Sequence, residues 1–437
     1  MKQRYNILDY GAVAGSDELQ TAKIQAAVDA AFLAGGGEVV VPAGHFKTAT
    51  IKLRSNITFR LLSGAVLDGS TDPSDYTHFL DDKLEPINPD EEFDDEVDAQ
   101  YGQAHYLRKR WFDAILKAYK AKNIKILGEE GSEINGHNAY NPDGEEGYRG
   151  PHAIEMTYCK NVEFAGYTIR DSGNWGHTIN KSENLFAHDL KVFGGHDGFH
   201  PTMCRNILIE DCEFRTGDDC IAGFANENMV IRNCYLDCAC SAMRLGGSDI
   251  LVDGCTTHAP STYGFRGSLS KEEKAASAPT NETHRHTQHT PFLYFCDFAA
   301  KTTKPQGNIL IQNCTFEQPN SFFRLRWGQQ WCRGLPLVDI TFKNCKCTGV
   351  SLPIDLYCDE NEPCTLRLED VEISAREGFE DKPFMHADKF KQIYFENVTV
   401  TGFTDPTILS KSEGEVIMKN STPIKFQLTD VLHDKYV

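Results

Sequence analysis

A short phrase recurs along the chain at a nearly constant interval. In each copy an Asn or Asp is followed by two to four alternating β-forming residues. Consecutive copies begin at Asn161, Asn184, Asn206, Asn228 and Asp249, in steps of 23, 22, 22 and 21 along the numbering. A fixed interval of about 20 to 50 residues is typical of solenoids, in which each unit stacks on the next. The repeat therefore predicts a chain built from stacked coils.

The composition of the repeat indicates what each coil contains. Val, Ile, Phe and Thr alternate with polar residues, Gly, Asn and Asp separate the runs, and helical periodicity is absent. Such runs form short strands joined by turns. Three strands and their bends fit in one coil of about 22 residues, with the coils about 4.8 Å apart. A leucine-rich repeat would need a recurrent Leu framework, and a propeller blade about 40 residues. We therefore predict an all-β fold, a single parallel β-helix with Asn side chains stacked at its bends.

The ends and the interruptions of the repeat complete the predicted organisation. Residues 21–34 have the pattern of a helix that ends in a run of Gly, and a helix across the first coil would cover its exposed strand edges. We expect residues 1–437 to form one domain. An acidic-then-basic stretch at 81–110 and a polar, His-rich stretch at 267–307 break the repeat. Insertions of this kind often border a binding cleft, although solvated loops are the alternative.

The cysteines follow the repeat. The chain has 15 Cys, an odd number, and several of them directly follow Asn, Asp or Gly at one point of the repeat. Free Cys is among the most buried residue types, so a thiol at a fixed place in each coil indicates packing. We expect reduced core cysteines and no disulfide framework.

The overall charge limits the partners. The chain has 63 Asp and Glu against 44 Lys and Arg, a net charge of -19. This charge disfavours nucleic acid and anionic membranes as general partners. No apolar run approaches the roughly 18 residues of a membrane span, and the N-terminus lacks the apolar core of a signal peptide. The sequence thus predicts a cytoplasmic protein.

Three aspartates carry the chemical prediction. Asp197 and Asp219 are one coil apart in the sequence, and Asp218 adjoins Asp219. Residues one coil apart lie above each other, so these carboxylates should be neighbours. Carboxylates in close contact divide into a protonated and an ionised form, the acid and base that glycoside hydrolysis needs. Both adjacent aspartates can serve only if the chain bends at Gly217, a residue that tolerates a bend. The alternatives are turn-capping aspartates and a Ca²⁺ site.

The motifs around these aspartates resemble those of the polygalacturonase family, glycoside hydrolase family 28, of the pectin-lyase-like right-handed parallel β-helix superfamily. The segment 217–222, Gly-Asp-Asp-Cys-Ile-Ala, matches the family's paired-Asp motif. Residues 9–12, 24–27, 37–42 and 171–177 resemble its N-terminal signature and the coil before its active site. The resemblance implies inversion at the anomeric carbon, with Asp218 as the acid and Asp197 and Asp219 as the residues that activate water.

The sequence also departs from the family pattern. The family's Asn-Thr-Asp motif is reduced here to its Asp in residues 195–197. The supporting His of its Gly-His-Gly motif is absent at 240–242, and only Arg266 remains of its Arg-Ile-Lys motif. That Arg and Lys hold the substrate carboxylate in the family, so the loss of the Lys leaves galacturonate specificity open. The candidate substrate-binding residues are Arg266, Arg244, His200, His196, His177 and Trp175, each of which has a structural alternative as a packed or satisfied side chain.

The sequence supports one leading function and two alternatives. The first is an inverting, exo-acting glycoside hydrolase on pectin-derived, uronate-containing or related oligosaccharides, with no cofactor and no metal. The second is a uronate lyase or epimerase on the same scaffold, which would use Ca²⁺ and an Arg base. The third is a glycan-binding β-helix whose catalytic machinery has decayed. His284, His286 and His289 have a spacing that suits a metal but lack supporting ligands, so we do not predict a metal site there.

Overall fold

The computed structural model describes residues 3–76, 84, 113–277, 288–297, 302, 304–329 and 331–432. The predicted insertion at 81–110 therefore lies outside the described residues, apart from Leu84. The chain separates into two compact units. Unit 1 comprises Met1–Asp218 with Tyr263–His284, and unit 2 comprises Asp219–Thr262 with Arg285–Val437. That residues 1–437 form one domain stays a prediction.

The described strands belong to one large sheet whose strand pairs are parallel. This confirms the predicted all-β fold, a right-handed parallel β-helix with a helix over its first coil. The register confirms the coil interval, since Leu185 lies beside Val162 of the preceding coil and beside Ile207 of the following one. Among the described residues no helix is long and apolar enough to cross a bilayer.

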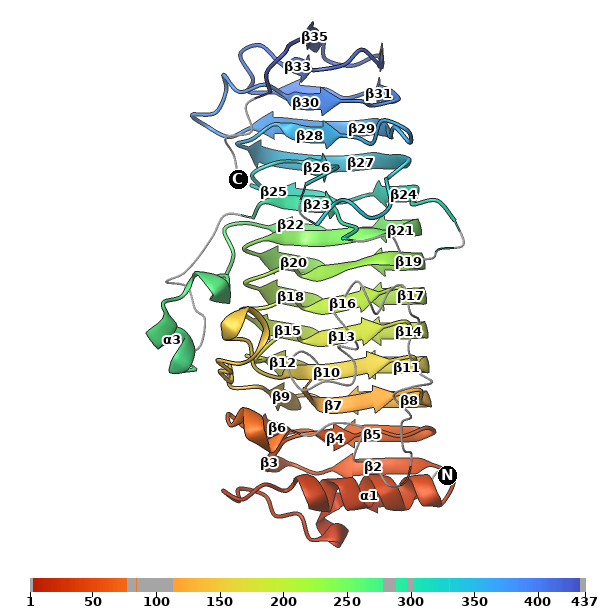
Figure 1. The fold of residues 1–437 in the computed structure, drawn as a ribbon, viewed down its shortest axis with the longest axis vertical. Helices are drawn as coiled ribbons and strands as arrows, with labels where there is room; N and C mark the ends of the chain where they lie inside the picture. The colour runs from red at the N-terminus through yellow and green to blue at the C-terminus, as the bar shows by residue number, and fades with distance from the viewer. Residues whose placement is uncertain are drawn as a thin grey trace. The chain divides into compact units, whose positions relative to one another are not determined.

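Unit 1 stacks its strands in three columns, one of which is labelled β8, β11, β14 and β17 on the right of Figure 1. The first column contains β1 (Arg4–Asn6), β2 (Gly37–Val41), β5 (Ile57–Leu61), β8 (Lys122–Gly128), β11 (Lys160–Ala165), β14 (Glu183–His188) and β17 (Arg205–Glu210). The second contains β3 (Gly44–Thr48), β6 (Ala65–Gly69), β9 (Glu133–Asn135), β12 (Thr168–Arg170), β15 (Lys191–Gly194) and β18 (Glu213–Thr216). The third contains β4 (Ile51–Lys52), β7 (Ala114–Tyr119), β10 (His152–Thr157), β13 (His177–Asn180) and β16 (Phe199–Thr202).

Unit 2 has the same kind of pattern within itself, and its longest strands turn from one column into the next. Its strands are β19 (Ile221–Arg232), β20 (Tyr235–Cys238), β21 (Ser241–Asp253), β22 (Thr256–His258), β23 (Thr290–Tyr294), β24 (Gly307–Gln312), β25 (Thr315–Glu317), β26 (Phe323–Arg326), β27 (Asp339–Val350), β28 (Ile354–Tyr357), β29 (Thr365–Ala375), β30 (Met385–Asp388), β31 (Gln392–Glu396), β32 (Thr399–Thr401), β33 (Thr407–Ser410), β34 (Glu415–Lys419) and β35 (Lys425–Leu428).

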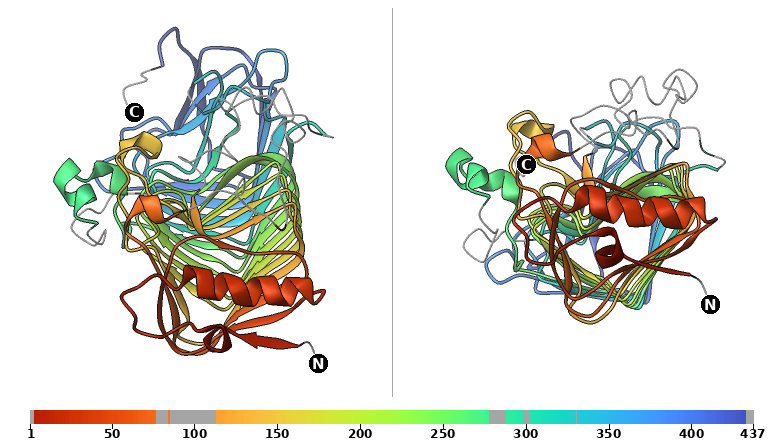
Figure 2. Two further views of the ribbon diagram at one scale, coloured as in Figure 1. Left: turned by 60° about the horizontal axis from the view of Figure 1, so that its bottom comes forward. Right: turned by 90° about the horizontal axis from the view of Figure 1, so that it is seen from below.

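Helices contribute little to either unit. Helix α1 (Thr21–Leu33) lies across the first coil (Figure 2), as predicted for residues 21–34, and its buried residues are Ile24, Ala27, Val28 and Ala31. The other helices in the described part of the chain are η1 (Ile7–Tyr10), η2 (Pro73–Asp75), η4 (Glu145–Gly147), η5 (Arg266–Ser268) and α3 (Lys271–Ala275). The last two lie in the predicted insertion 267–307 or directly before it.

Asparagine side chains stack at one bend of the coils, as the repeat predicts. Asn184 donates through Nδ2 to Oδ1 of Asn161 at 2.8 Å, and Asn206 does the same to Asn184 at 2.9 Å. All three have positive φ, between 55° and 58°. Asn adopts this left-handed conformation more readily than most residues with a side chain. The repeated Asn therefore adopts the backbone conformation of the bend and also forms the side-chain hydrogen bonds that link neighbouring coils.

None of the 15 cysteines forms a disulfide in the structure, and all except the half-buried Cys240 are buried. Within unit 2, the thiols of Cys234, Cys255, Cys314 and Cys345 interact along consecutive coils. Neighbouring thiols, more than burial, raise the pKa values of Cys255 and Cys314, whereas burial raises that of Cys204 to about 12. The burial agrees with the predicted core cysteines, and their reduced state stays a prediction.

The thiol content gives a direct solution test. We expect a thiol reagent to modify about one cysteine of the native protein, because buried thiols with raised pKa values are unreactive. In denaturant and without reductant, we expect all 15 thiols to react. A shortfall in denaturant that reductant restores would contradict the reduced state.

Candidate active site

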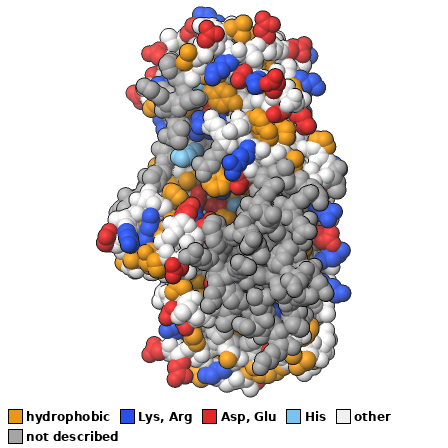
Figure 3. All heavy atoms as spheres, viewed as in Figure 1, with side chains coloured by type: hydrophobic (Ala, Val, Ile, Leu, Met, Phe, Trp, Pro, Cys, Tyr) orange, Lys and Arg blue, Asp and Glu red, His pale blue; other side chains and the backbone are white. Residues whose placement is uncertain are grey.

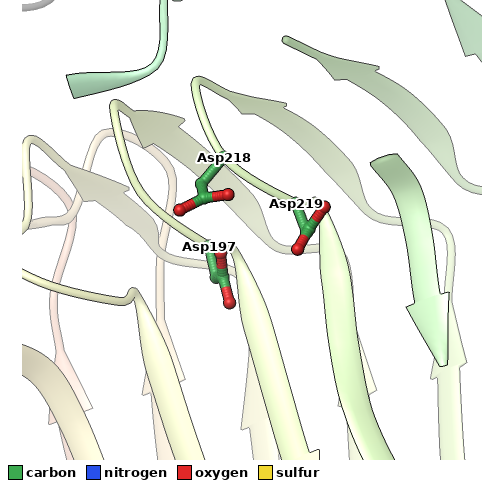
Figure 4. A group of neighbouring side chains, drawn as sticks. All are labelled: Asp197, Asp218 and Asp219. Atoms are coloured by element: carbon green, nitrogen blue, oxygen red, sulfur yellow. The ribbon is translucent and has the colours of Figure 1, made fainter. Parts of the chain in front are cut away.

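The three aspartates lie where coils bend from the second strand column into the third. Asp197 follows β15 and precedes β16, and the pair Asp218–Asp219 follows β18 and precedes β19. Figure 4 shows the three carboxylates turned toward a common space. One oxygen from each lies within 4.8 Å of the other two. The predicted clustering is confirmed, while the chemical role of each residue stays a prediction.

Gly217 permits the bend for a different reason from the predicted one. Its backbone is not in the left-handed region, so conformational freedom is not what selects it. A Cβ at this position would lie 1.9 Å from the carbonyl oxygen of Gly264 and 2.9 Å from Cα of Gly195. Because the backbone of Gly264 and Gly195 approaches Gly217 this closely, only glycine fits directly before Asp218.

Asp197 is held by a histidine that stacks on a tryptophan. Its Oδ2 lies 2.7 Å from Nδ1 of His200, and only 1% of the residue is exposed. The His200 ring lies 4.0 Å from the Trp175 ring, with the planes 13° apart. Both residues are among the predicted substrate-binding set, and their contacts show one task, which is to fix the orientation of Asp197.

Asp219 is held by two donors. The backbone N–H of Ser241 donates to Oδ1 at 2.8 Å, and Nε of Arg244 donates to Oδ2 at 2.5 Å. The Arg244 guanidinium lies 4.3 Å from the centre of the Phe295 ring. Charge-assisted bonds of this kind are among the stronger ones in proteins and stabilise the ionised carboxylate. Arg244, a predicted substrate-binding residue, is thus paired with a predicted catalytic residue.

Asp218 is the most exposed of the three side chains and is held by a residue that sequence reasoning missed. Nη2 of Arg149 donates to its Oδ2 at 3.2 Å, and the Asp218 side chain is 14% exposed against 4% for Arg149. The same guanidinium donates to Glu146, Asn174 and His196 at 3.1–3.3 Å. Burial opposes the charge of Arg149, but the neighbouring acidic groups, with Glu145 first, raise its pKa above the ordinary value.

Arg149 gives little signal in the sequence. It lies in the long segment between β9 and β10, within a coil that is much longer than the repeat. The Asn ladder shows this length, because Asn161 bonds to Asn123, which is 38 residues earlier. A residue outside the regular interval cannot be aligned with the aspartates by counting. The one available clue is Glu146, three residues before Arg149, which pairs with it.

His196 lies beside the aspartates, as predicted, and is buried. Nη1 of Arg149 donates to its Nδ1, and its ring stacks against Tyr148 with the centroids 5.9 Å apart. Burial and, after it, the charge of Arg149 hold its pKa well below the usual value. Its Nε2 has no hydrogen-bond partner among the described residues. His196 is therefore a neutral ring with one unpaired nitrogen.

His177, another predicted substrate-binding residue, makes contacts inside the protein. His177 is fully buried, with Nε2 bonded to the hydroxyl of Tyr167 at 2.9 Å and Nδ1 to the carbonyl of Gly198 at 3.1 Å. Burial lowers its pKa to about 4. Because both ring nitrogens are engaged, we do not carry His177 into the proposed site.

Arg266 is 1% exposed and connects loops of unit 1. Its Nη2 donates to the carbonyl oxygens of Asn138 and Lys274, each at 3.0 Å, and its backbone N–H donates to Gly195. Burial lowers its pKa. The Arg266 side chain thus links two loops of unit 1 through hydrogen bonds, and its contact with a substrate stays a prediction.

The His-rich stretch contributes no described site. His284 and His286 lie outside the described residues, and the backbone N–H of His289 donates to the carbonyl of Cys240. Among the described residues, the three aspartates are the only group of three or more potential metal ligands that come together. On the face drawn in Figure 3, acidic and basic side chains are interspersed over the described surface.

Comparison with known proteins places this cluster in a family context. The family model "Glycosyl hydrolases family 28" matches residues 83–240, the segment that contains all three aspartates. An exo-poly-alpha-D-galacturonosidase of Dickeya chrysanthemi is 28% identical over 248 residues, which are 49% of this chain and 41% of the relative. A mannuronan C5-epimerase, AlgE5 of Azotobacter vinelandii, is 49% identical over 45 residues, 10% of this chain and 4% of the relative.

Solved structures support the fold. The family 28 exopolygalacturonase of Yersinia enterocolitica superposes with a TM-score of 0.65 and 17% identity, over 96% of this chain and 78% of that one. The matched regions span less than half of the length of the first curated relatives. The chain is thus a right-handed parallel β-helix, and its predicted resemblance to the polygalacturonase family is confirmed.

Proposed function

We propose that the protein is an inverting, exo-acting glycoside hydrolase that acts on pectin-derived or related oligosaccharides. The observation that carries this proposal is the cluster of Asp197, Asp218 and Asp219 within 4.8 Å, on the segment that matches family 28. The relative from Dickeya chrysanthemi, named as an exo-acting galacturonosidase, supports both the substrate and the exo mode. No cofactor is part of the proposal.

The contacts of the three aspartates suggest how they divide the work. Asp197 and Asp219 are nearly buried and accept bonds from His200, Ser241 and Arg244, which suits carboxylates that remain ionised and remove a proton from water. Asp218 is more exposed, and its bond to Arg149 uses only Oδ2. Its Oδ1 is the atom we assign to protonation of the leaving oxygen.

The spacing of the carboxylates bears on the stereochemistry. Inverting pairs are usually separated by about 6.5–9.5 Å and retaining pairs by about 5–5.5 Å. The nearest oxygens of this cluster lie closer than either range. Inversion therefore rests on the family resemblance and on a base made of two aspartates, which can hold the water between themselves.

The anomeric configuration of the first product provides the test. We expect oligogalacturonides or rhamnogalacturonan oligomers to be cleaved, with inverted configuration in a proton NMR time course before mutarotation. Release of single sugars from one end would support the exo mode. Retained configuration would contradict inversion, and an unsaturated product that absorbs in the ultraviolet would contradict hydrolysis.

A uronate lyase or epimerase is the second candidate function. Three carboxylates within 4.8 Å suit a divalent cation, with Arg244 beside them as a base, and the short match to the epimerase is a second observation in favour. A chelator separates the two candidates, because it should abolish a Ca²⁺-dependent reaction and leave hydrolysis unchanged. A glycan-binding protein without activity is the third, and it should bind oligosaccharides without turnover.

We also propose a cytoplasmic location. A chain with 15 cysteines and no disulfide is typical of a reducing compartment, since neighbouring thiols of secreted proteins usually become oxidised. Fractionation of cells that express the untagged protein tests this, and recovery outside the cytoplasm would contradict it.

A further inference from the structure

His196 has a hydrogen-bond donor that nothing in the described protein uses. A guanidinium nitrogen can only donate, so the contact between Nη1 of Arg149 and Nδ1 of His196 makes Nδ1 the acceptor. A neutral imidazole that accepts through Nδ1 carries its proton on Nε2. Nε2 is buried, and it has no acceptor among the described residues. A buried donor without an acceptor is rare and destabilising in proteins, so such a group calls for an explanation.

The surroundings keep the ring in this state. His196 is 3% exposed, and the cationic groups with the largest effect on its pKa include Arg149, Arg266 and Lys274, in addition to its burial. Each of them opposes a second proton on the ring. The stacked Tyr148 fixes the plane of the imidazole, so the direction of the Nε2–H bond is fixed as well.

The position of the donor relates it to the aspartates. His196 precedes Asp197 in the chain, and both are among the residues that line one small cavity of about 10 Å³. Arg149, which holds Nδ1, also holds Oδ2 of Asp218. One guanidinium therefore orients a predicted catalytic carboxyl and a neutral donor together, all within unit 1.

We propose that Arg149 is a positioning residue that holds His196 as a neutral Nε2–H donor for an oxygen of the bound carbohydrate. The ligand oxygen, a hydroxyl, ring or carboxylate oxygen, completes the bond that the protein leaves open. The nature of the ligand rests on the proposed function, whereas the tautomer follows from the structure alone. Specificity benefits because a ligand without an acceptor at this point leaves the buried N–H unpaired.

The tautomer can be measured directly. In protein with ¹⁵N-labelled histidine, we expect the long-range ¹H–¹⁵N spectrum to show His196 protonated on Nε2 only, with the signal assigned by its loss in His196→Gln. Arg149→Met should remove this preference, because the donor to Nδ1 is gone. A wild-type ring protonated on Nδ1, or on both nitrogens, would overturn the inference.

Matched substitutions test the donor in the reaction. A Gln amide nitrogen reaches roughly the place of Nε2, whereas the shorter Asn side chain does not. We therefore expect His196→Asn to lose about 10–100-fold in kcat/KM and His196→Gln to lose clearly less. Circular dichroism and thermal unfolding should be alike for the two variants. Equal losses in both would show that His196 only packs, and would overturn the inference.

The outcome is separable from that of the proposed function. If the wild-type protein cleaves no oligosaccharide, the proposed function fails, and a titration with oligogalacturonide followed on the His196 Nε2–H signal still tests the donor. Suppose instead that the wild type is active and the His196 Nε2–H signal does not move when the protein is saturated with oligogalacturonide. Then the ligand does not accept this hydrogen bond, and Nε2–H meets a trapped water or no acceptor. The function then stands and the inference is wrong.

Discussion

Asp218→Asn is expected to abolish turnover while the protein keeps its fold and its affinity for oligosaccharide. The amide is nearly isosteric with the carboxyl group and still accepts the bond from Nη2 of Arg149. It cannot supply a proton to the leaving oxygen, and a positioned general acid is worth about 10²–10⁴-fold in rate. We expect kcat to fall within or beyond that range and the dissociation constant, measured by calorimetry, to change little.

A matched control makes this result interpretable. Asp211 is exposed, lies seven residues earlier on the same coil and has a φ of 54°, a conformation that Asn also tolerates. Asp211→Asn should therefore leave both kcat and affinity unchanged. Asp218→Asn with near wild-type turnover would remove the proposed acid and favour a different chemistry. Wild-type protein that binds but never turns over would favour the glycan-binding alternative.

The fold was accessible from the sequence because its information is local and periodic. The repeat interval determines the register of strands such as β14 and β17, and the same interval brings Asp197 and Asp219 to neighbouring coils. The bend residue was also identifiable, although the role of Gly217 follows from a contact with Gly264, which is distant in sequence. The repeat interval thus predicts the stacking of the coils, but it does not predict contacts between segments that are far apart in the sequence.

The residues around the aspartates were predicted less well for a related reason. Arg149 lies in an irregular coil and reaches Asp218 across 69 residues of sequence, a contact that no interval encodes. His177 is in a strand with Ile179, two residues later, so both side chains point to the interior. Strand alternation could therefore have excluded it. His200 and Arg244 were identified as candidates, but their pairing with Asp197 and Asp219 needed the three-dimensional structure.

Gly217→Ala is expected to be among the most damaging single substitutions in the protein. The added Cβ would lie 1.9 Å from the carbonyl oxygen and 2.5 Å from the carbonyl carbon of Gly264. Both atoms belong to the backbone, so no flexible side chain can move aside and a loop of unit 1 must shift. Overpacking of this kind costs about 1–3 kcal/mol of stability or more.

The same shift reaches the site, because Gly217 directly precedes Asp218. Misplacement of a catalytic group by about 1 Å can cost about 10²-fold in rate, so we expect kcat to fall by at least that factor along with the melting temperature. Gly194→Ala is the matched control, since its Cβ would meet nothing closer than the backbone nitrogen of Asp171 at 3.3 Å. A Gly217→Ala protein that melts and turns over like Gly194→Ala would show that the bend before Asp218 is not held by this contact.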